Sequence, residues 1–567
     1  MNRKVILLTF IVSGMAALIY EIAWIRPLHF IFGSTTYTLA TIYSAFMLGL
    51  GFGSAIMSRL IKRIKNELFA YSLVEILIGI YGISFLFLLY PLLDIYKIIG
   101  AFHNNLSIFY TMNYMLIFAF ILIPTLLMGS TWPLLAKAYV KKIGKHVGEL
   151  YSANNIGAII GSFAAGFILI PFLGIKNTIA IASLFSLFAA SLVLYFVQRK
   201  TLIKIAVPVA LLFILLFTFS SYDTHALFVK GFYRAWVVPE QRYGMHEILF
   251  HKEGLHATID VHEEEGIVRS LLINGKGQGG TSIRDMRVNY LLAYLPLLLH
   301  DNPKNALVIG LGTGTTAGNL ARHVKTKVVE IEPAVIDAAK YFNNINKNVL
   351  ENENVEIVLA DIRNYLSYSK EKFDIIVSEP SDPWQEFSAF LWSKEFFEII
   401  AEHLNEEGIY AQWVPIYTMN VRDFRNIYKT FSFVFPYIIA FSNVRKGEWF
   451  TSTPSEIILI GSRKPLNVDN IERKFYMLDK ESIDDLNYVM FHNVINRAQG
   501  ETAADRIKSL LLFDYQTIRG YAEDARIITD DNMLLEFSTA MNFLEQKAID
   551  VVGDIKRYVS RVRKSYG

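Results

Sequence analysis

A glycine-rich turn opens the part of the chain whose residues are best suited to chemistry. Gly310-Leu311-Gly312-Thr313-Gly314 follows an apolar run and precedes a helix-like segment. Strand, glycine turn and helix in this order are typical of a nucleotide-handling βα unit, because glycines let the backbone pass close to a ligand. Gly310, Gly312, Thr313 and Gly314 are therefore candidate cofactor-binding residues, against the alternative of an ordinary solvated turn.

Acidic residues follow the next three predicted strands. Glu330 stands about twenty residues past the first glycine, where a doubly wound fold places a carboxylate that accepts from ribose hydroxyls. Asp361 ends the third strand, and Glu379 and Asp382 follow the fourth. Ligands in open α/β sheets bind beyond the carboxyl ends of the strands, so we expect these side chains to meet in one cleft. The four predicted strands cover residues 306–309, 327–329, 356–359 and 373–377.

These residues carry a resemblance to a known family, the spermidine synthases or polyamine aminopropyltransferases. The resemblance runs from roughly His256 to Glu536 and implies a Rossmann-like α/β domain of the class I methyltransferase type, preceded by a small β-domain. The motifs that carry it are Glu330-Ile331-Glu332-Pro333-Ala334-Val335-Ile336, Ala360-Asp361 and Ser378-Glu379-Pro380-Ser381-Asp382-Pro383.

The resemblance implies a role for each acidic candidate. Glu379 would accept the proton of the attacking amine, and Asp382 would anchor the acceptor, with Gln412 as a further substrate-binding residue. Glu330 would hold the ribose and Asp361 the adenine amine of the cofactor.

Two more cofactor-binding candidates come from the same comparison. Ile362 stands beside Asp361. Gln278 closes Asn274-Gly275-Lys276-Gly277-Gln278, which resembles the end of the family's N-terminal β-domain. A plain turn residue is the alternative for Gln278.

The chain also departs from the family pattern. Glu379 stands where the family has Asp, Thr313 stands where it usually has an Asp near the amine side of the cofactor, and Ala257 aligns with a cofactor-contacting Gln. The segment 287–290 does not match the family's polyamine-contacting His or Tyr clearly. These departures concern residues expected near the acceptor and the aminopropyl group more than residues expected near the nucleoside. The sequence therefore supports an adenosyl cofactor more strongly than it supports any particular acceptor.

Three functions follow. An alkylamine is mostly protonated near pH 7, with a pKa of about 10, so its attack on a sulfonium needs a carboxylate that takes its proton. The first hypothesis is an aminopropyltransferase that uses decarboxylated S-adenosylmethionine and an amine such as putrescine, releasing methylthioadenosine. The second is a methyltransferase that uses intact S-adenosylmethionine. The third is a polyamine or nucleoside transporter or sensor with a non-catalytic soluble domain.

Composition divides the chain into two parts. Hydrophobic residues make up 53% of the 567 residues, yet few charged residues come before Asp223. A net charge of +3 without a basic stripe argues against a nucleic-acid partner. Cysteine is absent, which excludes thiolate metal sites and disulfides, and the spacing of His246 and His251 does not fit a zinc motif, so we expect no metal.

The sequence before Asp223 predicts a multi-pass protein of the cell membrane, with the lipid bilayer as a partner. Six consecutive apolar runs followed by a seventh resemble half of a major-facilitator-type transporter. Basic loops suggest a cytoplasmic N-terminus, so seven spans would place the soluble domain outside, whereas cofactor supply favours the cytoplasm. The sequence leaves the side of the membrane open. The seven runs lie near 5–30, 36–57, 68–92, 114–139, 150–173, 178–197 and 202–219.

Polar residues and glycines within these runs invite two interpretations. Glu21 and Glu75 are ionisable groups in membrane spans and so candidates for function, with a structural Glu21–Arg26 ion pair as the alternative. Five glycines suit close helix packing better than a ligand role, namely Gly49, Gly51, Gly53, Gly157 and Gly161.

The domain plan has five segments. A transmembrane bundle of about seven helices covers 1–220, and a connector covers 221–245. A small β-domain of short strands covers 246–282, and the Rossmann-like domain covers 283–540. The helical tail, 541–567, should pack on the sheet or mediate self-association, which would give a homodimer.

Overall fold

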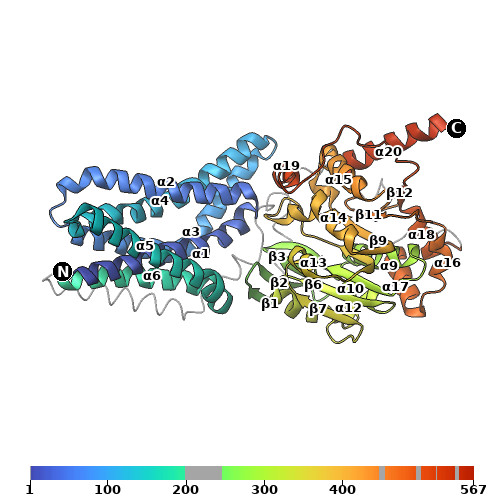
Figure 1. Ribbon diagram of the computed structural model, residues 1–567, viewed down its shortest axis with the longest axis horizontal. Coiled ribbons are helices and arrows are strands. Elements are labelled where there is room, and N and C mark those ends of the chain that lie inside the picture. The colour runs from blue at the N-terminus through green and yellow to red at the C-terminus, as the bar shows by residue number, and fades with distance from the viewer. Residues whose placement is uncertain are drawn as a thin grey trace. The chain divides into compact units, whose positions relative to one another are not determined.

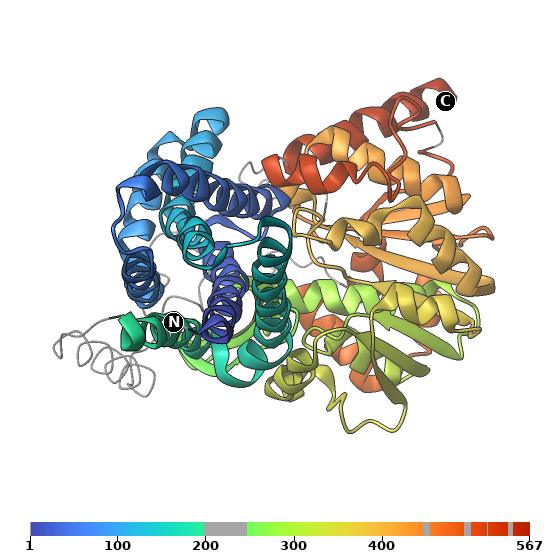
Figure 2. The ribbon, with the colours of Figure 1, turned by 60° about the vertical axis from the view of Figure 1, so that its left-hand side comes forward.

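The computed structural model describes residues 2–197, 246–445, 454–492, 500–518, 520–542 and 548–566. The chain forms two compact units (Figures 1 and 2). One comprises Met1–Arg242 with Lys252–Thr258, and the other comprises Tyr243–His251 with Ile259–Gly567. The predicted seventh span, 202–219, and the connector, 221–245, lie outside the described residues.

The first unit is a bundle of helices whose starts are set by polar caps. The side chains of Asn2, Thr35, Asn66 and Asn105 each accept from a backbone N–H of the first turn. α1 lies in the middle and contacts each of the other five described helices (Figure 2). The helices are α1 (Arg3–Phe32), α2 (Thr36–Leu60), α3 (Glu67–Ile99), α4 (Leu106–Tyr139), α5 (Ile143–Ala164) and α6 (Ile170–Val197), with a π-helical turn at Ala165–Leu169.

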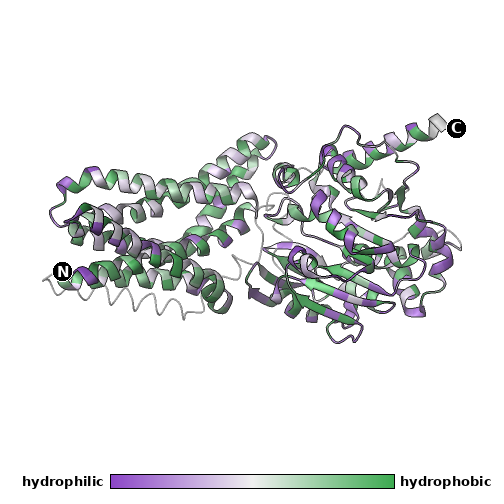
Figure 3. Cartoon of the chain, viewed as in Figure 1, coloured by the Kyte–Doolittle hydropathy of each residue, from purple (hydrophilic) through white to green (hydrophobic). Residues whose placement is uncertain are grey.

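Within the described residues, five helices are long and apolar enough to cross a membrane. The longest, Ile143–Val197, has 55 residues and is broken at Gly174, whose φ of 80° and ψ of 169° are not helical. The break explains why the sequence predicts two runs in this stretch. Figure 3 shows the apolar residues spread along all of these helices.

Glycines bring the helix backbones of this unit together. A Cβ on Gly157 would lie 1.9 Å from the carbonyl oxygen of Ile11, and one on Gly53 would lie 2.0 Å from that of Leu126. Gly161 and Gly49 are equally crowded, so four of the five glycine predictions are confirmed. The prediction for Gly51 is wrong, because no described atom lies within 4 Å of a Cβ built there.

The suggested Glu21–Arg26 ion pair does not form in the described part of the chain. Both residues lie on α1, and Glu21 is buried. Five residues of an α-helix, at 3.6 residues per turn, put the two side chains on different faces. Glu21 is therefore not neutralised by its nearest basic neighbour in sequence.

The second unit begins with a small sheet in the order β1-β2-β3-β4. β3 pairs antiparallel with β2 and β4. Asn274 and Gly275 link the last two strands with φ values of 50° and 76°, as a tight hairpin requires. The last strand was not predicted, because its residues are mostly glycines. The strands are β1 (His246–Glu253), β2 (Thr258–Glu264), β3 (Val268–Ile273) and β4 (Lys276–Gly280).

The large sheet has eight strands in the order β12-β10-β11-β9-β8-β5-β6-β7. β5 to β9 are parallel, and β11, β10 and β12 extend the sheet antiparallel beyond β9. The Rossmann-like prediction is confirmed, and the four predicted strands are β5 to β8. The strands are β5 (Asn305–Ile309), β6 (Lys325–Glu330), β7 (Val355–Leu359), β8 (Phe373–Ser378), β9 (Leu404–Val414), β10 (Tyr437–Ser442), β11 (Ile457–Ser462) and β12 (Leu511–Phe513).

Helices cover the sheet, and an aromatic and aliphatic core fills the space between (Figure 1). Tail residues Val551 and Ile555 belong to this core, so the tail packs on the domain. A 3-10 turn, Ser388–Trp392, precedes the helix that starts after the cap Ser393. The helices are α9 (Ile283–Leu299), α10 (Thr315–Ala321), α11 (Pro333–Ala339), α12 (Asn343–Asn346), α13 (Ile362–Tyr368), α14 (Lys394–His403), α15 (Val421–Val434), α16 (Asn470–Phe475), α17 (Lys480–Phe491), α18 (Ala503–Ser509), α19 (Leu534–Asn542) and α20 (Ala548–Tyr566).

Candidate active site

The glycine turn after β5 has a conformation that needs its glycines. Gly310, Gly312 and Gly314 have φ values of 84°, 53° and 80°, a region that side chains with a Cβ disfavour. Glu330, at the end of the neighbouring β6, is buried and holds the turn in place. Its Oε2 accepts from the N–H of Leu311 and its Oε1 from that of Glu332, each at 2.8 Å.

The glycine turn, β4 and α9 come together around Thr313. A Cβ on Gly279 of β4 would lie 3.5 Å from Thr313 Cγ2 and 4.0 Å from Asn289 Oδ1. The Thr313 hydroxyl lies 2.8 Å from that of Thr315 at the start of α10. The small sheet therefore supplies one side of the site and α9 another.

Glu379 follows β8, the strand beside β5 at which the strand order reverses. A doubly wound sheet binds its ligand at such a switch point. Asn289 donates from Nδ2 to both carboxylate oxygens, at 3.0 and 2.8 Å. Burial, aided by the negative charges of Glu456 and Asp285, raises the pKa of Glu379 to about 8, although the Asn289 bonds oppose this shift. This carboxyl group can therefore take up and release a proton near neutral pH.

Glu456 is a second carboxylate at this edge, and the sequence analysis missed it. It directly precedes β11, which runs antiparallel to β9, with Ile457 opposite Val414. The start of β11 thus lies at the same edge as the ends of β8 and β9. Asn443 donates from Nδ2 to Glu456 at 2.6 Å, and burial raises the pKa of Glu456. No local motif reveals such a residue, because its place depends on an antiparallel strand pairing.

Asp382 is fully buried and already has a cationic partner. Its Oδ2 forms an ion pair with Lys276 Nζ from β4 and accepts from the Tyr417 hydroxyl at 3.3 Å. Its Oδ1 has no hydrogen-bond partner among the described residues. Lys276 is itself 7% exposed. The sequence analysis quoted Lys276 only as part of a turn, because the inward direction of its side chain depends on the unpredicted β4.

The remaining predicted residues divide into two groups. Gln278 joins the site, since its Nε2 donates to Gln385 Oε1 at 3.3 Å in the loop after Asp382. Asp361 lies at the same sheet edge, where it caps α13 by accepting from the N–H of Asn364 at 2.9 Å. Ile362 beside it packs into the core.

Gln412 lies on β9 opposite Ser378, the residue before Glu379. It is fully buried on β9, accepts from the Tyr410 hydroxyl and donates to the carbonyl of Trp413 at 3.0 Å. Its oxygen and one of its two N–H groups are thus bonded within its own strand, and the substrate contact stays a prediction. In the described part of the chain, no group of three or more His, Asp or Glu side chains is arranged to hold a metal.

The strand order, the glycine turn and the carboxylates at the switch point define a class of protein, the Rossmann-like domains of class I methyltransferase type. Comparison with known proteins narrows this class. The family described as "Spermine/spermidine synthase domain" matches residues 286–446. A polyamine aminopropyltransferase of Thermococcus onnurineus (strain NA1) is 30% identical over 203 residues, which are 34% of this chain and 71% of that protein. The chain therefore belongs to the polyamine aminopropyltransferase family.

A second relative matches a longer part of the chain. Polyamine aminopropyltransferase 2 of Aquifex aeolicus (strain VF5) is 25% identical over 475 residues, which are 82% of this chain and 88% of that protein. Because the second unit alone makes up a smaller share than this, the similarity extends into the helical unit. A crystal structure of a spermidine synthase in complex with the transition state analogue AdoDATO is 21% identical and covers 46% of this chain and 84% of its own, with a TM-score of 0.36.

Proposed function

We propose that this chain is a membrane-bound aminopropyltransferase, which transfers an aminopropyl group from decarboxylated S-adenosylmethionine to an amine. One observation carries the proposal. At the switch point of the sheet, next to the glycine turn, Glu379 has a pKa of about 8 and is held by two hydrogen bonds from Asn289. Such a carboxyl group is matched to an amine nucleophile, whose proton must leave near neutral pH.

The reaction balances with Glu379 as the base. The acceptor nitrogen attacks the propyl carbon attached to the sulfonium, a nitrogen–carbon bond forms, and the carbon–sulfur bond breaks. The bonding pair of electrons stays on sulfur, so methylthioadenosine leaves as a neutral thioether. The proton of the attacking nitrogen passes to Glu379. Asn289 keeps the carboxylate oriented toward that nitrogen, because it binds both oxygens.

The nucleoside side would be held by the turn and the acidic strand ends. Each Glu330 oxygen accepts one backbone N–H and has a second lone pair for a ribose hydroxyl. Asp361 uses one oxygen to cap α13, which leaves the other for the adenine amine. Thr313 would offer a hydroxyl to the amine end of the donor, and Gln278 would contact the cofactor from β4.

The acceptor side differs from a simple cluster of carboxylates. Lys276 neutralises Asp382 within the fold, so Asp382 would contact the acceptor through the Oδ1 that has no partner rather than as a net negative charge. Glu456 has a weaker cationic partner, Arg284, 3.5 Å from its Oε1, whose side chain is 62% exposed. Glu456 is then the carboxylate that would attract a second ammonium of a diamine, in place of this Arg284 contact. We infer that Lys276 disfavours acceptors that place a positive charge beside Asp382.

The helical unit would anchor the enzyme in a bilayer as a multi-pass protein. Five of its helices are long and apolar enough to span. Large apolar side chains also point outward, among them Met47, Met115, Ile159 and Phe172. Contact of this apolar surface with lipid would be favourable, whereas its contact with water would be unfavourable.

The side of the membrane can be tested directly, because the natural chain has no cysteine. A single Lys370→Cys substitution in an exposed loop of the second unit allows labelling in intact cells with a membrane-impermeant maleimide. Labelling only after the cells are broken places the catalytic domain in the cytoplasm. Labelling of intact cells places it outside.

A product assay tests the function. Detergent-purified protein is incubated with decarboxylated or intact S-adenosylmethionine and a panel of amines, and the products are identified by mass. We expect methylthioadenosine and an amine heavier by one aminopropyl group. S-adenosylhomocysteine would instead identify a methyltransferase, and binding without any product would favour the transporter or sensor hypothesis.

A further inference from the structure

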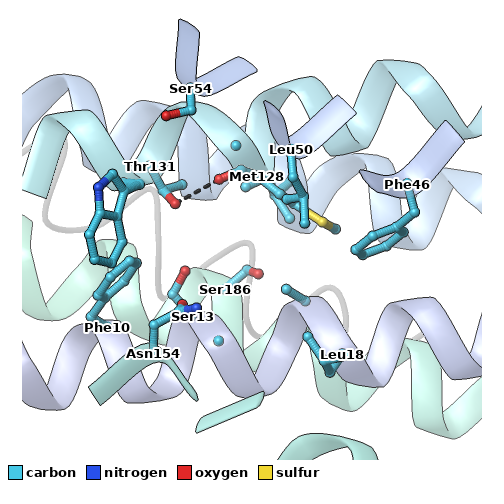
Figure 4. Close-up of a pocket in the computed structure, with 15 residues that line it drawn as sticks. Phe10, Ser13, Leu18, Phe46, Leu50, Ser54, Met128, Thr131, Asn154 and Ser186 are labelled. Carbon is cyan, nitrogen blue, oxygen red and sulfur yellow. Dashed lines mark hydrogen bonds between the residues drawn. The ribbon is translucent and has the colours of Figure 1, made fainter. Parts of the chain in front are cut away.

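A cavity of about 250 Å³ lies inside the helical unit (Figure 4). All six helices described for this unit, α1 to α6, contribute to its wall, so it is a central feature of the bundle rather than a surface groove. It is smaller than the pockets of roughly 300–1,000 Å³ that hold drug-sized molecules, which restricts it to a small ligand. The helices α1 to α6 contribute, in this order, the wall residues Ser13, Leu50, Ile78, Trp132, Asn154 and Ser186.

A carboxyl group lies directly behind the cavity wall. Glu75 is 1% exposed and stands one turn before Ile78 on α3. The hydroxyl of Ser13, which lines the cavity, donates to Glu75 Oε1. The carboxyl group is therefore one side chain away from anything that occupies the cavity.

This carboxyl group has no basic partner among the described residues. Among the residues described for the helical unit, ion pairs join Arg3 with Glu149 and Lys137 with Glu67. The Ser186 hydroxyl, which lies near Ser13 in the cavity wall (Figure 4), is fully buried and makes no hydrogen bond to another described group. Ionisable groups in membrane spans usually pair with each other or mark the path of a ligand. Here a buried hydroxyl without a partner and an acid without a cation flank the same cavity.

The rest of the wall suits a short hydrocarbon chain. Leu50, Ile78 and Met128 line it, and Phe10 packs against Trp132 with ring centroids 5.4 Å apart. Aromatic faces attract ammonium groups, and aliphatic side chains accommodate methylenes. The cavity thus combines an acid and hydroxyls with apolar walls, which is the pattern that an alkylammonium ion needs.

We propose that this cavity binds a short aliphatic amine in its ammonium form, with Glu75 as the counter-charge and the Ser13 and Ser186 hydroxyls as ligands. This site is separate from the acceptor site at the sheet edge. It rests on the geometry of the helical unit alone and stands whether or not the second unit turns over.

Equilibrium dialysis with radiolabelled 1,4-diaminobutane on the full chain in nanodiscs tests the proposal. We expect two molecules of the amine, or two equivalents, to bind per natural chain. Glu75→Gln should lower the affinity of the cavity site at least tenfold, so that only one bound molecule remains. Ala17→Phe, which fills the cavity while keeping Glu75, should remove the same equivalent. Glu149→Gln, a carboxylate of α5 paired with Arg3 outside the cavity, is the matched control and should retain both.

The outcomes separate the two sites. Two equivalents in both cavity variants would overturn the cavity proposal. The cavity proposal would also be overturned if the chain binds a single amine whose binding survives Glu75→Gln but is lost in Glu379→Gln. That result would leave the proposed enzyme function intact. One equivalent lost in both cavity variants supports the cavity site and speaks against the acceptor site. The thermal unfolding temperature of each variant in nanodiscs shows that a loss is not a loss of fold, and displacement of the amine by Na⁺ alone would overturn the ligand class.

Discussion

The two units bury carboxyl groups in different ways. In the α/β unit, Asp382 has Lys276 from the same fold, and Glu379 has two hydrogen bonds from Asn289. In the helical unit, Glu75 has a serine hydroxyl and no basic partner in the described residues. A buried charge must be paired or lose its charge. The α/β unit supplies its partner from within, whereas the helical unit leaves that place to a proton or to a ligand.

The largest expected effect concerns the base. Glu379→Gln keeps the size of the side chain but cannot take the proton, so turnover should fall by about 10²- to 10⁴-fold. The rate of methylthioadenosine release measures this, with nucleoside binding retained. Glu398→Gln, an exposed residue of α14 paired with Lys394, is the control. Turnover near the natural rate in Glu379→Gln would remove the proposed role.

The contrast between paired and unpaired carboxyl groups can be tested through stability. Lys276→Met leaves the buried Asp382 charge alone and should destabilise the α/β unit by about 3–5 kcal/mol, because Lys276 is the only cation paired with Asp382 among the described residues. Adding Asp382→Asn should recover most of this loss. Glu75→Gln should leave the unfolding temperature unchanged or higher. Calorimetry of the full chain in detergent measures all three, and an equal loss in Glu75→Gln would break the comparison.

Packing in the helical unit gives a smaller effect. Gly157→Ala puts a methyl group against the carbonyl of Ile11 and should destabilise the bundle by about 1–3 kcal/mol. Gly51→Ala is the matched control, since no described atom lies within 4 Å of its added Cβ, and it should change little. Unfolding temperatures in detergent distinguish them. Equal losses would mean that helix propensity rather than backbone contact explains these glycines.

The smallest effect concerns pH. Glu379 is active when deprotonated, so turnover should rise with pH through about 8 and level off above it. Glu456 raises the pKa of Glu379, so Glu456→Gln should shift this rise to lower pH and increase turnover at pH 7 several-fold with a monoamine acceptor. With a diamine, KM should increase, since a counter-charge is lost. A pH profile that Glu456→Gln does not move would separate Glu456 from the site.

Local patterns predicted the parallel part of the sheet well. The apolar runs before Gly310, Glu330, Asp361 and Glu379 are β5 to β8. β5 and β8 are buried parallel strands, which have continuous apolar sequences, whereas β7 is the partly exposed edge strand of the sheet. β4 was missed because glycines give no strand pattern. With it, the inward direction of Lys276 was missed.

Residues that depend on distant pairing could not be predicted. Asn289 lies on a helix whose sequence is apolar on most sides, and only the packing of α9 directs its amide at Glu379. The substrate contact of Gln412 stays a prediction, and its bonds to Tyr410 and Trp413 lie along its own strand. The alternation of side chains on a strand does not reveal which face carries the ligand.

The two backbone bonds of Glu330 limit what a mutation there can teach. Two N–H groups approach two different oxygens of one side chain, which a carboxyl group can satisfy and an amide cannot, since a glutamine would face one N–H with its own NH₂. Glu330→Gln should therefore reshape the glycine turn even without cofactor. An inactive Glu330→Gln enzyme would say as much about the architecture of the empty protein as about recognition of a ribose.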